Sequence, residues 1–433
     1  MPKKEKIPPP GAKSDQYTNF FSKPKWKQAL AKPTLDLAGR NMRGPGALTV
    51  GNALAKSKFV TVVDLSGNHL GDDGAIEFAQ CLKTNDMIGT ISLACNEITD
   101  VGGIAIASAF IPTANPSGQP GQWNRSVSML NLAGNLLKDD SLFALCNAAV
   151  CHTDLYMVDL QYNKIGPLGA KGMWRMMQRQ TLCTFVLHHN ALGDEGTALI
   201  CAAWKRFGKT GTQAKLNLSC NDICKSGAEA VGELVRDNEF TTDVNLSWNT
   251  LGEKGMQLFT AKLLPPPSGG PSPKTVLVDL NVSYCRLGDG GACELAKLLE
   301  QNFESLIKIN AARNDIKDRG GVALARAMAK NTVLHTVNFA ENEFGDKTVD
   351  EMVAAIGAMK SLQKVVLRRC GLTDRHKDKL SSVAKNPPTI DAGARDDAVM
   401  LTEFLDKVKD YMEAHKPDEN EGKKKKKGKA AKA

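Results

Sequence analysis

The sequence predicts an α/β solenoid, in which about twelve short strand–helix repeats of roughly 28 residues stack side by side. Three observations support this prediction: one motif recurs, its spacing is nearly constant, and each departure from that spacing contains loop-like sequence. The clearest copy reads Val63-Asp-Leu-Ser-Gly-Asn68, followed by a Gly-Asp-Asp-Gly segment that ends at Gly74. Close relatives of this motif begin at Ile91, Val158, Leu216 and Val244.

The last residue of the motif, which we call the ladder position, can be followed through every repeat. Eight of the eleven steps between successive ladder positions are 27 to 29 residues long. The three longer steps contain insertions near residues 112–123, 209–213 and 265–274, which have loop composition. The twelve occupants of the ladder position are Arg40, Asn68, Asn96, Asn135, Asn163, Asn190, Asn221, Asn249, Cys285, Asn314, Asn342 and Cys370.

Each repeat begins with a short strand, because the alternation of Val63 and Leu65 predicts a strand with one buried face. The asparagine that follows can bond backbone groups of its own turn and of the neighbouring turn, so stacked copies are predicted to form a ladder. Cys285 and Cys370 fit this position as small residues. Arg40 does not fit, as expected for a terminal repeat that acts as a cap.

A helix is predicted after the ladder position. The glycine of the Leu-Gly-Asp-x-Gly-Ala segment bends the chain, and the aspartate is predicted to cap the N-terminus of the helix that follows it. Ile76, Phe78, Ala79 and Leu82 give the second repeat an apolar helical stripe. The aspartates with this predicted capping role are Asp72, Asp100, Asp194, Asp289 and Asp346.

These motifs resemble the leucine-rich repeats of the ribonuclease-inhibitor-like subfamily. The resemblance covers residues 34–386. It implies a right-handed horseshoe with a parallel sheet inside and helices outside. Twelve stacked strands would give an inner arc on the order of 55 Å, since strands lie ~4.8 Å apart.

The two ends of the chain differ from the repeats in charge. Formal net charge is +9, of which residues 1–33 carry +6 and residues 416–433 carry +5, so the rest carries −2. The N-terminal segment is predicted to be a basic tail whose aromatics (Tyr17, Phe20, Phe21 and Trp26) cover the first repeat or dock a partner. Residues 387–415 are predicted to form a capping helix, and residues 416–433 a disordered Lys-rich tail.

The sequence indicates no catalytic, cofactor or metal site. Eleven cysteines include no Cys-x-x-Cys pair and no Cys/His set with zinc spacing, so we expect reduced thiols. His188 and His189 have no nucleophile or carboxylate placed beside them, and adjacent strand residues point to opposite faces. We therefore expect a protein that is not an enzyme.

The inner face of the solenoid is predicted to be polar. The residues four before each ladder position are expected to face the concave side, and most are short and polar. They are Asp36, Asp64, Ser92, Asn131, Asp159, Val186, Asn217, Asn245, Asn281, Asn310, Asn338 and Val366.

We call the position directly before the ladder position the rim position. Its first four occupants are small, whereas aromatic, histidine and arginine side chains gather there from the fifth repeat onward. Tyr, Trp and Arg dominate the energies of protein interfaces, so this rim is predicted to bind a partner. The alternative is that large side chains stack on one another and merely close the rim. The predicted binding residues, at the rim position or one residue before it, are Tyr162, His188, His189, Trp248, Tyr284, Arg313, Arg368 and Arg369.

Taken together, these features predict a non-enzymatic intracellular scaffold for protein–protein interaction. The concave face and rim would hold the partner, while the basic tails would attach to an acidic assembly such as tubulin tails or nucleic acid. We expect a cytoplasmic protein, cytoskeletal or flagellar in setting, since no signal peptide or membrane-spanning stretch is evident. The alternatives are a GTPase activator of the Ran-activator type, which has the same kind of repeat, an inhibitor of a partner enzyme, and nuclear placement through Lys423 to Lys427.

Overall fold

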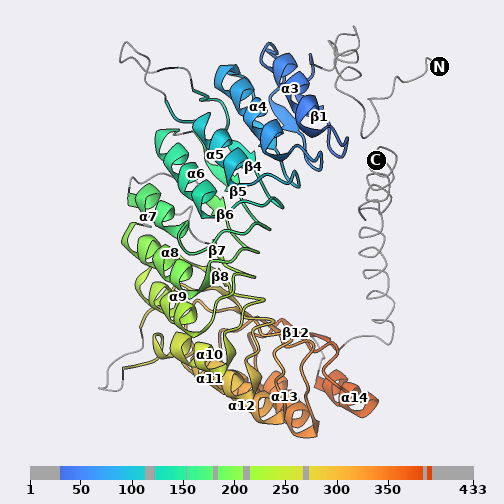
Figure 1. Cartoon of the computed structure of the whole chain (residues 1–433). Coiled ribbons are helices and arrows are strands. Elements are labelled where there is room, and N and C mark those ends of the chain that lie inside the picture. Colours follow the sequence, from blue (N-terminus) through green and yellow to red (C-terminus); the bar gives the residue numbers. More distant parts are fainter. Residues whose placement is uncertain are drawn as a thin grey trace, which may run out of the picture.

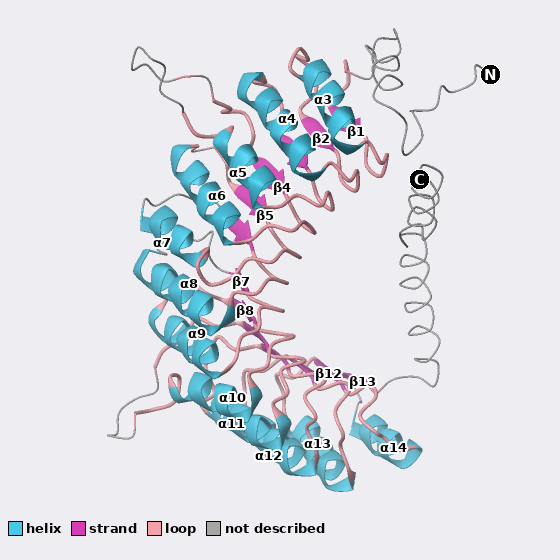
Figure 2. Ribbon diagram, viewed as in Figure 1, coloured by secondary structure: helices cyan, strands magenta, loops and turns pink. Residues whose placement is uncertain are grey.

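The computed structural model describes residues 30–112, 121, 123–152, 154–178, 184–207, 215–266, 273–383 and 388–392. These residues form a curved array of strand–helix units, with helices along the outer side of the arc and strands toward the inner side (Figures 1 and 2). The predicted leucine-rich repeat solenoid is thereby confirmed. The N-terminal aromatics, most of each insertion, most of the predicted capping helix and the Lys-rich tail lie outside the described residues.

Strands and helices alternate along the described chain. Each strand has three residues: β1 Thr34–Asp36, β2 Val62–Asp64, β3 Thr90–Ser92, β4 Met129–Asn131, β5 Met157–Asp159, β6 Thr184–Val186, β7 Lys215–Asn217, β8 Asp243–Asn245, β9 Asp279–Asn281, β10 Lys308–Asn310, β11 Thr336–Asn338, β12 Lys364–Val366 and β13 Thr389–Asp391. The helices are α3 Arg43–Leu54, α4 Gly71–Thr84, α5 Asp100–Ser108, α6 Asp139–Cys151, α7 Ala170–Gln178, α8 Gly193–Phe207, α9 Lys225–Asp237, α10 Gly252–Ala261, α11 Gly288–Glu300, α12 Asp318–Lys330, α13 Asp346–Ala358 and α14 Asp374–Val383.

All strand pairs are parallel and in register, because every repeat places its strand at the same point of its turn. Thr34 pairs with Val62 and Asp36 with Asp64, and the same pattern recurs along the array. β13 is a strand that the repeat pattern did not predict. It lies at the start of the segment expected to be a capping helix, and Thr389 pairs with Lys364 of β12. This strand covers the edge that β12 would otherwise expose.

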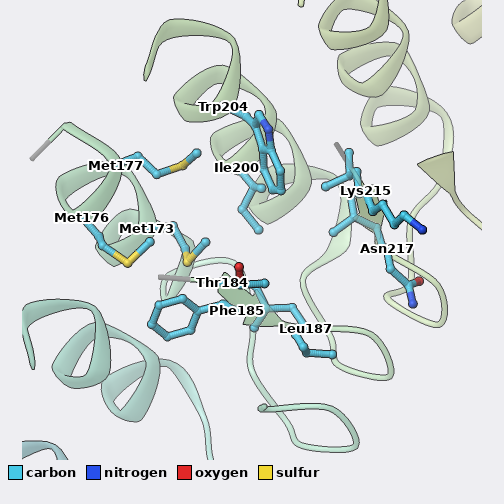
Figure 3. Close-up of a pocket in the computed structure, with 13 residues that line it drawn as sticks. Met173, Met176, Met177, Thr184, Phe185, Leu187, Ile200, Trp204, Lys215 and Asn217 are labelled. Atoms are coloured by element: carbon cyan, nitrogen blue, oxygen red, sulfur yellow. The ribbon is translucent and has the colours of Figure 1, made fainter. Parts of the chain in front are cut away.

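The pairing of parallel strands is interrupted once among the described residues, between β6 and β7. β1 to β6 form one sheet and β7 to β13 form a second, whereas a single sheet was predicted. At the preceding junction Leu160 donates its backbone N–H to the carbonyl of Val186 at 2.9 Å. No corresponding bond joins Leu187 to Asn217 among the described residues. The gap opens into a cavity of about 120 Å³, whose walls include Met173, Phe185 and Trp204 (Figure 3).

The core lies between the sheets and the helices. Val63 and Leu65 are buried under α4, and Phe78 and Leu82 of that helix are buried against them. Full burial of such a side chain contributes about 1.5–3 kcal/mol. Ile76, predicted to lie on the same buried stripe, is only half-buried because Ala75 takes the inward-facing position.

The first-turn aspartates hold the helix of the next repeat, and the prediction that they cap their own helix is wrong. The Oδ1 atom of Asp72 in α4 accepts the backbone N–H groups of Thr99 at 2.8 Å and Gly102 at 3.0 Å, at the start of α5. An aspartate inside the first turn lies beside the neighbouring helix terminus, whose N–H groups have no partner within their own helix. The same kind of contact joins Asp100 to the start of α6, Asp194 to the start of α9 and Asp289 to the start of α12. Asp346 instead accepts a hydrogen bond from the side chain of His376 in α14.

Candidate partner-binding rim

The asparagine at the ladder position joins its repeat to the preceding one. Asn249 is buried, and its Oδ1 accepts the backbone N–H groups of Asn221 at 2.9 Å and Ile223 at 3.0 Å. Its Nδ2 donates to the carbonyls of Leu218 and Leu246. Asn163 makes the same kinds of bond but is only half-buried.

Cysteine replaces asparagine in two repeats without breaking this pattern. The Sγ atom of Cys285 lies 3.1 Å from the carbonyl oxygen of Leu246, and that of Cys370 lies 3.1 Å from the carbonyl oxygen of Phe339. Burial raises the pKa of the Cys285 thiol to about 12, so it stays protonated and can donate.

The rim position has a left-handed backbone in each of the twelve repeats. Three of these residues are glycines, at positions 39, 67 and 134, and in the other nine φ lies between 50° and 59°. A residue other than glycine costs about 1–2 kcal/mol in this conformation. The large side chains at the rim are therefore not required by the turn. The nine are Cys95, Tyr162, His189, Cys220, Trp248, Tyr284, Arg313, Glu341 and Arg369.

Backbone hydrogen bonds fix the spacing of the rim, including the part beside the gap between the sheets. Each rim residue donates its N–H to the carbonyl just before the next rim residue, as Trp248 does to Ser283 at 3.0 Å. At the gap His189 donates to Ser219 at 2.9 Å, and Cys220 donates to Ser247 at 3.0 Å. The rim is thus continuous where the sheet is not.

Three of the predicted binding residues form a stack, which we call the Trp248 stack. The rings of Trp248 and Tyr284 lie 3.7 Å apart between centroids and are inclined by 16°. The guanidinium of Arg313 lies 4.6 Å from the Tyr284 ring centroid and donates to the Tyr284 hydroxyl. Arg313 also pairs with Glu341 at 3.4 Å, and Arg369 approaches Glu341 to 4.0 Å. Trp248 is nevertheless 54% exposed.

A second group, which we call the His189 cluster, precedes it along the rim. Tyr162 stacks on His189 with ring centroids 4.0 Å apart, and the Nδ1 atoms of His188 and His189 lie 2.7 Å apart. The two histidines therefore lie together, contrary to the expectation of opposite faces, because the left-handed residue ends the strand alternation. Burial lowers the pKa of His188 despite nearby Asp159, and burial and His188 lower that of His189.

Arg368 lies apart from these two groups. Its Nε donates to both carboxylate oxygens of Asp391 in β13, at 2.6 and 2.7 Å. The structure therefore brings six of the eight predicted residues into two groups on one rim. It links Arg369 to Arg313 through Glu341 and places Arg368 at the C-terminal strand. Glu341 links Arg313 and Arg369 and was not among the predicted binding residues, although its place in the rim series marks it.

The polar residues of the concave face are largely occupied by their own turns. Asn245 Oδ1 accepts the backbone N–H of Ser247 at 3.0 Å, and Asp64 Oδ1 accepts that of Ser66 at 2.9 Å. The first residues of β7 to β10 form a charged row that was not predicted, although strand alternation places them on the same face. In that row Lys215 pairs with Asp243 at 3.9 Å, and Lys308 pairs with Asp279.

Other functional signals are few in the described ranges. No group of three or more His, Cys, Asp or Glu side chains there is placed to hold a metal ion. No helix there combines the length and apolar character needed to cross a membrane.

Comparison with known proteins supports the repeat assignment. The family model described as "Leucine Rich repeat" matches residues 56–79, 87–107, 215–232 and 274–296. The human NACHT, LRR and PYD domains-containing protein 13 is 28% identical over 188 residues, covering 42% of this chain and 17% of that protein. Ribonuclease inhibitor of Sus scrofa is 25% identical over 243 residues, covering 55% of this chain and 51% of the inhibitor. The chain thus matches about one sixth of the first relative and half of the second.

One solved structure, from the octameric complex of Latrophilin 3, Unc5D and FLRT2 (LRR), is 14% identical with a TM-score of 0.40, covering 73% of this chain and 86% of that chain. The repeat spacing, the ladder and the family-model matches agree with one another. The chain is a leucine-rich repeat protein of the ribonuclease-inhibitor-like type.

Proposed function

We propose that this protein is a non-enzymatic scaffold that holds a protein partner on its concave face and on the rim formed by the Trp248 stack and the His189 cluster. The observation that carries the proposal is the exposed stack of Trp248, Tyr284 and Arg313 on a backbone that favours glycine. Non-glycine residues in strained conformations concentrate at functional sites.

Preorganisation gives this stack its value as a binding surface. Ordering a flexible side chain at an interface costs about 0.5–1.5 kcal/mol, and neighbours already hold Tyr284 and Arg313 in place. Trp248 and Tyr162 keep about half of their surface exposed, so they can still bury area against a partner. Stacking within the rim and binding through it are therefore compatible.

The basic ends of the chain would add a second, less specific attraction. Residues 1–33 and 416–433 together carry +11 against −2 for the rest. Such tails favour an acidic assembly, for which tubulin tails and nucleic acid are the candidates, in a cytoskeletal or flagellar setting. This attraction would weaken as salt rises, because screening acts most strongly on exposed charges.

Inhibition of a partner enzyme is a second candidate function. It is favoured by the similarity to ribonuclease inhibitor over 55% of this chain. The partner would then be an enzyme whose activity falls when it occupies the concave face. Measuring the activity of a captured enzyme partner with and without this protein separates inhibition from scaffolding.

The proposal is tested with glycine substitutions at the rim. Partners captured by the full chain are identified and purified, and their affinities are measured for wild type and for Trp248→Gly with Tyr284→Gly. Because glycine suits this backbone, the double variant should fold while binding at least about tenfold more weakly, as expected for hot-spot residues. Cys95→Gly at the same rim position, outside both groups, is the matched control.

A deletion of residues 416–433 completes the test. It should weaken binding mainly at low salt and leave partner choice unchanged. If the double rim variant binds as tightly as wild type while the deletion abolishes binding, the solenoid is a spacer and the proposal is wrong.

A further inference from the structure

We call the rim position of one repeat a tier, and the tier between the His189 cluster and the Trp248 stack lacks a planar side chain. Between the His189 cluster and the Trp248 stack, the rim residue is Cys220, which is partly buried and has φ of 50°. Tyr162 and His189 stack within one group, and Trp248, Tyr284 and Arg313 stack within the other. The regular spacing of the rim is expected to direct the other ring faces of His189 and Trp248 toward the tier of Cys220.

The width of this tier suits one planar group. Adjacent planar groups on this rim lie 3.7, 4.0 and 4.6 Å apart. His189 and Trp248 are separated by two tiers, which at the strand spacing of ~4.8 Å amounts to about 10 Å. The backbone bonds from His189 to Ser219 and from Cys220 to Ser247 hold both tiers at the regular spacing despite the gap between the sheets.

A nearby carboxylate favours a positively charged group in this tier. Asp222, two residues after Cys220, is exposed and forms no ion pair with any described residue. The same relationship occurs where an arginine fills the tier: Asp315, two residues after Arg313, is among the groups that raise the pKa of Arg313, after its bond with Tyr284. Asp222 and Asp315 share the same left-handed φ of 56°, so a guanidinium in the tier of Cys220 would lie near Asp222 as Arg313 lies near Asp315. Arg313 itself forms its ion pair with Glu341 of the next repeat.

We propose that the tier of Cys220 is a slot for an arginine side chain of the partner, whose guanidinium stacks on Trp248 and pairs with Asp222. The inference rests on the proposed function and names the partner chemistry that the rim recognises. Arginine fits better than lysine, because only a planar cation can use both the ring face and the carboxylate. It fits better than an aromatic ring, because a ring would leave Asp222 without a cation.

The probe is the blocked tripeptide acetyl-Gly-Arg-Gly-amide, titrated into the full chain labelled with ¹⁵N. The indole resonance of Trp248, identified by its loss in Trp248→Phe, reports on the slot. It should shift and saturate with the arginine peptide, and the matching lysine peptide should bind about fivefold more weakly. Equal responses to both peptides, or tighter binding of the matching phenylalanine peptide, would contradict the proposal.

Two variants confirm the location. Cys220→Arg fills the slot from within and should abolish the response, and it should fold because Arg313 and Arg369 occupy the same backbone conformation. Asp222→Asn should weaken binding about fivefold. Cys220→Gly leaves the slot open and should bind like wild type. A response that persists in Cys220→Arg places the peptide elsewhere and overturns the proposal.

The failures of the slot and of the proposed function are distinguishable. If the peptide does not bind while Trp248→Gly with Tyr284→Gly still weakens the purified partner, the slot is wrong and the rim function stands. If the peptide binds in the slot and the partner is indifferent to the double variant, the slot stands and the proposed function is wrong.

Discussion

The Asp194 carboxylate of α8 accepts a hydrogen bond from the Ser226 hydroxyl of α9 at 2.6 Å, across the junction at which the two sheets separate. Asp194 also accepts the backbone N–H groups of Cys224 and Ser226. At the same junction Asn221 Nδ2 donates to the carbonyl of Leu187 at 3.0 Å. These contacts join the two halves of the solenoid where strand pairing is missing.

Asp194→Ala should therefore destabilise the protein more than most single carboxylate changes. It removes the acceptor for the donors of Cys224, Ser226 and Gly227 at the start of α9, a loss expected to cost about 1–3 kcal/mol. Chemical denaturation measures the effect. Glu195→Ala changes the exposed neighbour in the same helix turn and should have little effect. Equal losses in the two variants would contradict a capping role for Asp194.

The same contact predicts a loss of stability in acid. Partial burial raises the pKa of Asp194, but the hydrogen bonds from Ser226, Cys224 and Gly227 outweigh it and leave the pKa lowered. Because the folded pKa is depressed, this stabilisation is present above the usual value of 3.8 and is lost as pH falls through the folded pKa. Unfolding free energies at about pH 5 and pH 3 should differ less in Asp194→Asn than in wild type.

Asn249→Ala should lower the melting temperature markedly. The change leaves two buried N–H groups and two carbonyls without the side chain that satisfies them, and each unsatisfied group costs about 1–3 kcal/mol. Asn249→Cys should be milder, because Cys285 makes comparable contacts with its thiol. Calorimetry compares the two. Asn163→Ala should cost less, since Asn163 is only half-buried.

Gly134→Ala should destabilise the rim of the fourth repeat. Gly134 has φ of +66°, and an added Cβ would lie 2.8 Å from Sγ of Cys95. Conformational strain alone should cost about 1–2 kcal/mol. Gly357→Ala is the control, because that glycine lies in α13 and an added Cβ would meet no atom within 4 Å beyond its chain neighbours and its own helix backbone, so the change should gain stability. A tolerated alanine at position 134 would remove the case for rim strain.

The His189 cluster should make stability fall as the solution is acidified below neutral pH. Burial lowers the pKa of His188 and of His189 in the folded state. The unfolded chain then binds more protons near the usual pKa of 6.5, so stability is full above that value and declines as pH falls toward the folded pKa values. The free energy of unfolding, measured by urea denaturation, should fall less between about pH 7 and pH 5 in the double variant His188→Gln with His189→Gln than in wild type. If the unfolding free energy of the double variant fell with pH as steeply as that of wild type, the lowered pKa values of the two histidines would be contradicted.

The repeat architecture follows from the sequence because each repeat carries its own strand, ladder and helix signals. Asn249 could be assigned to the ladder from spacing alone, as could its role in joining neighbouring turns. The strand β13 could not be predicted, because Thr389–Asp391 is not followed by asparagine or cysteine at the ladder spacing. The sequence predicts that Asp72 caps its own helix, whereas its carboxylate binds the start of the next helix. Spacing within one repeat does not say which neighbour a side chain reaches.

The rim was only partly accessible to sequence reasoning. Counting back from the ladder placed Trp248, Tyr284 and Arg313 on one line, and the structure stacks them. The left-handed backbone under them is not evident from the sequence, because the glycines of the early repeats indicate small size as readily as a positive φ. The pairing of His188 with His189 was missed for the same reason, because strand alternation does not extend through a left-handed residue.

The interruption between β6 and β7 has a mechanical consequence. Elsewhere a tensile load along the arc is shared by paired strands, ladder bonds and helix caps, whereas at this junction strand pairing contributes nothing among the described residues. We therefore expect the arc to bend more readily at the junction between β6 and β7 than at the junctions between paired strands. A partner that spans both halves would then change the curvature of the arc at this junction while leaving the geometry of each half unchanged.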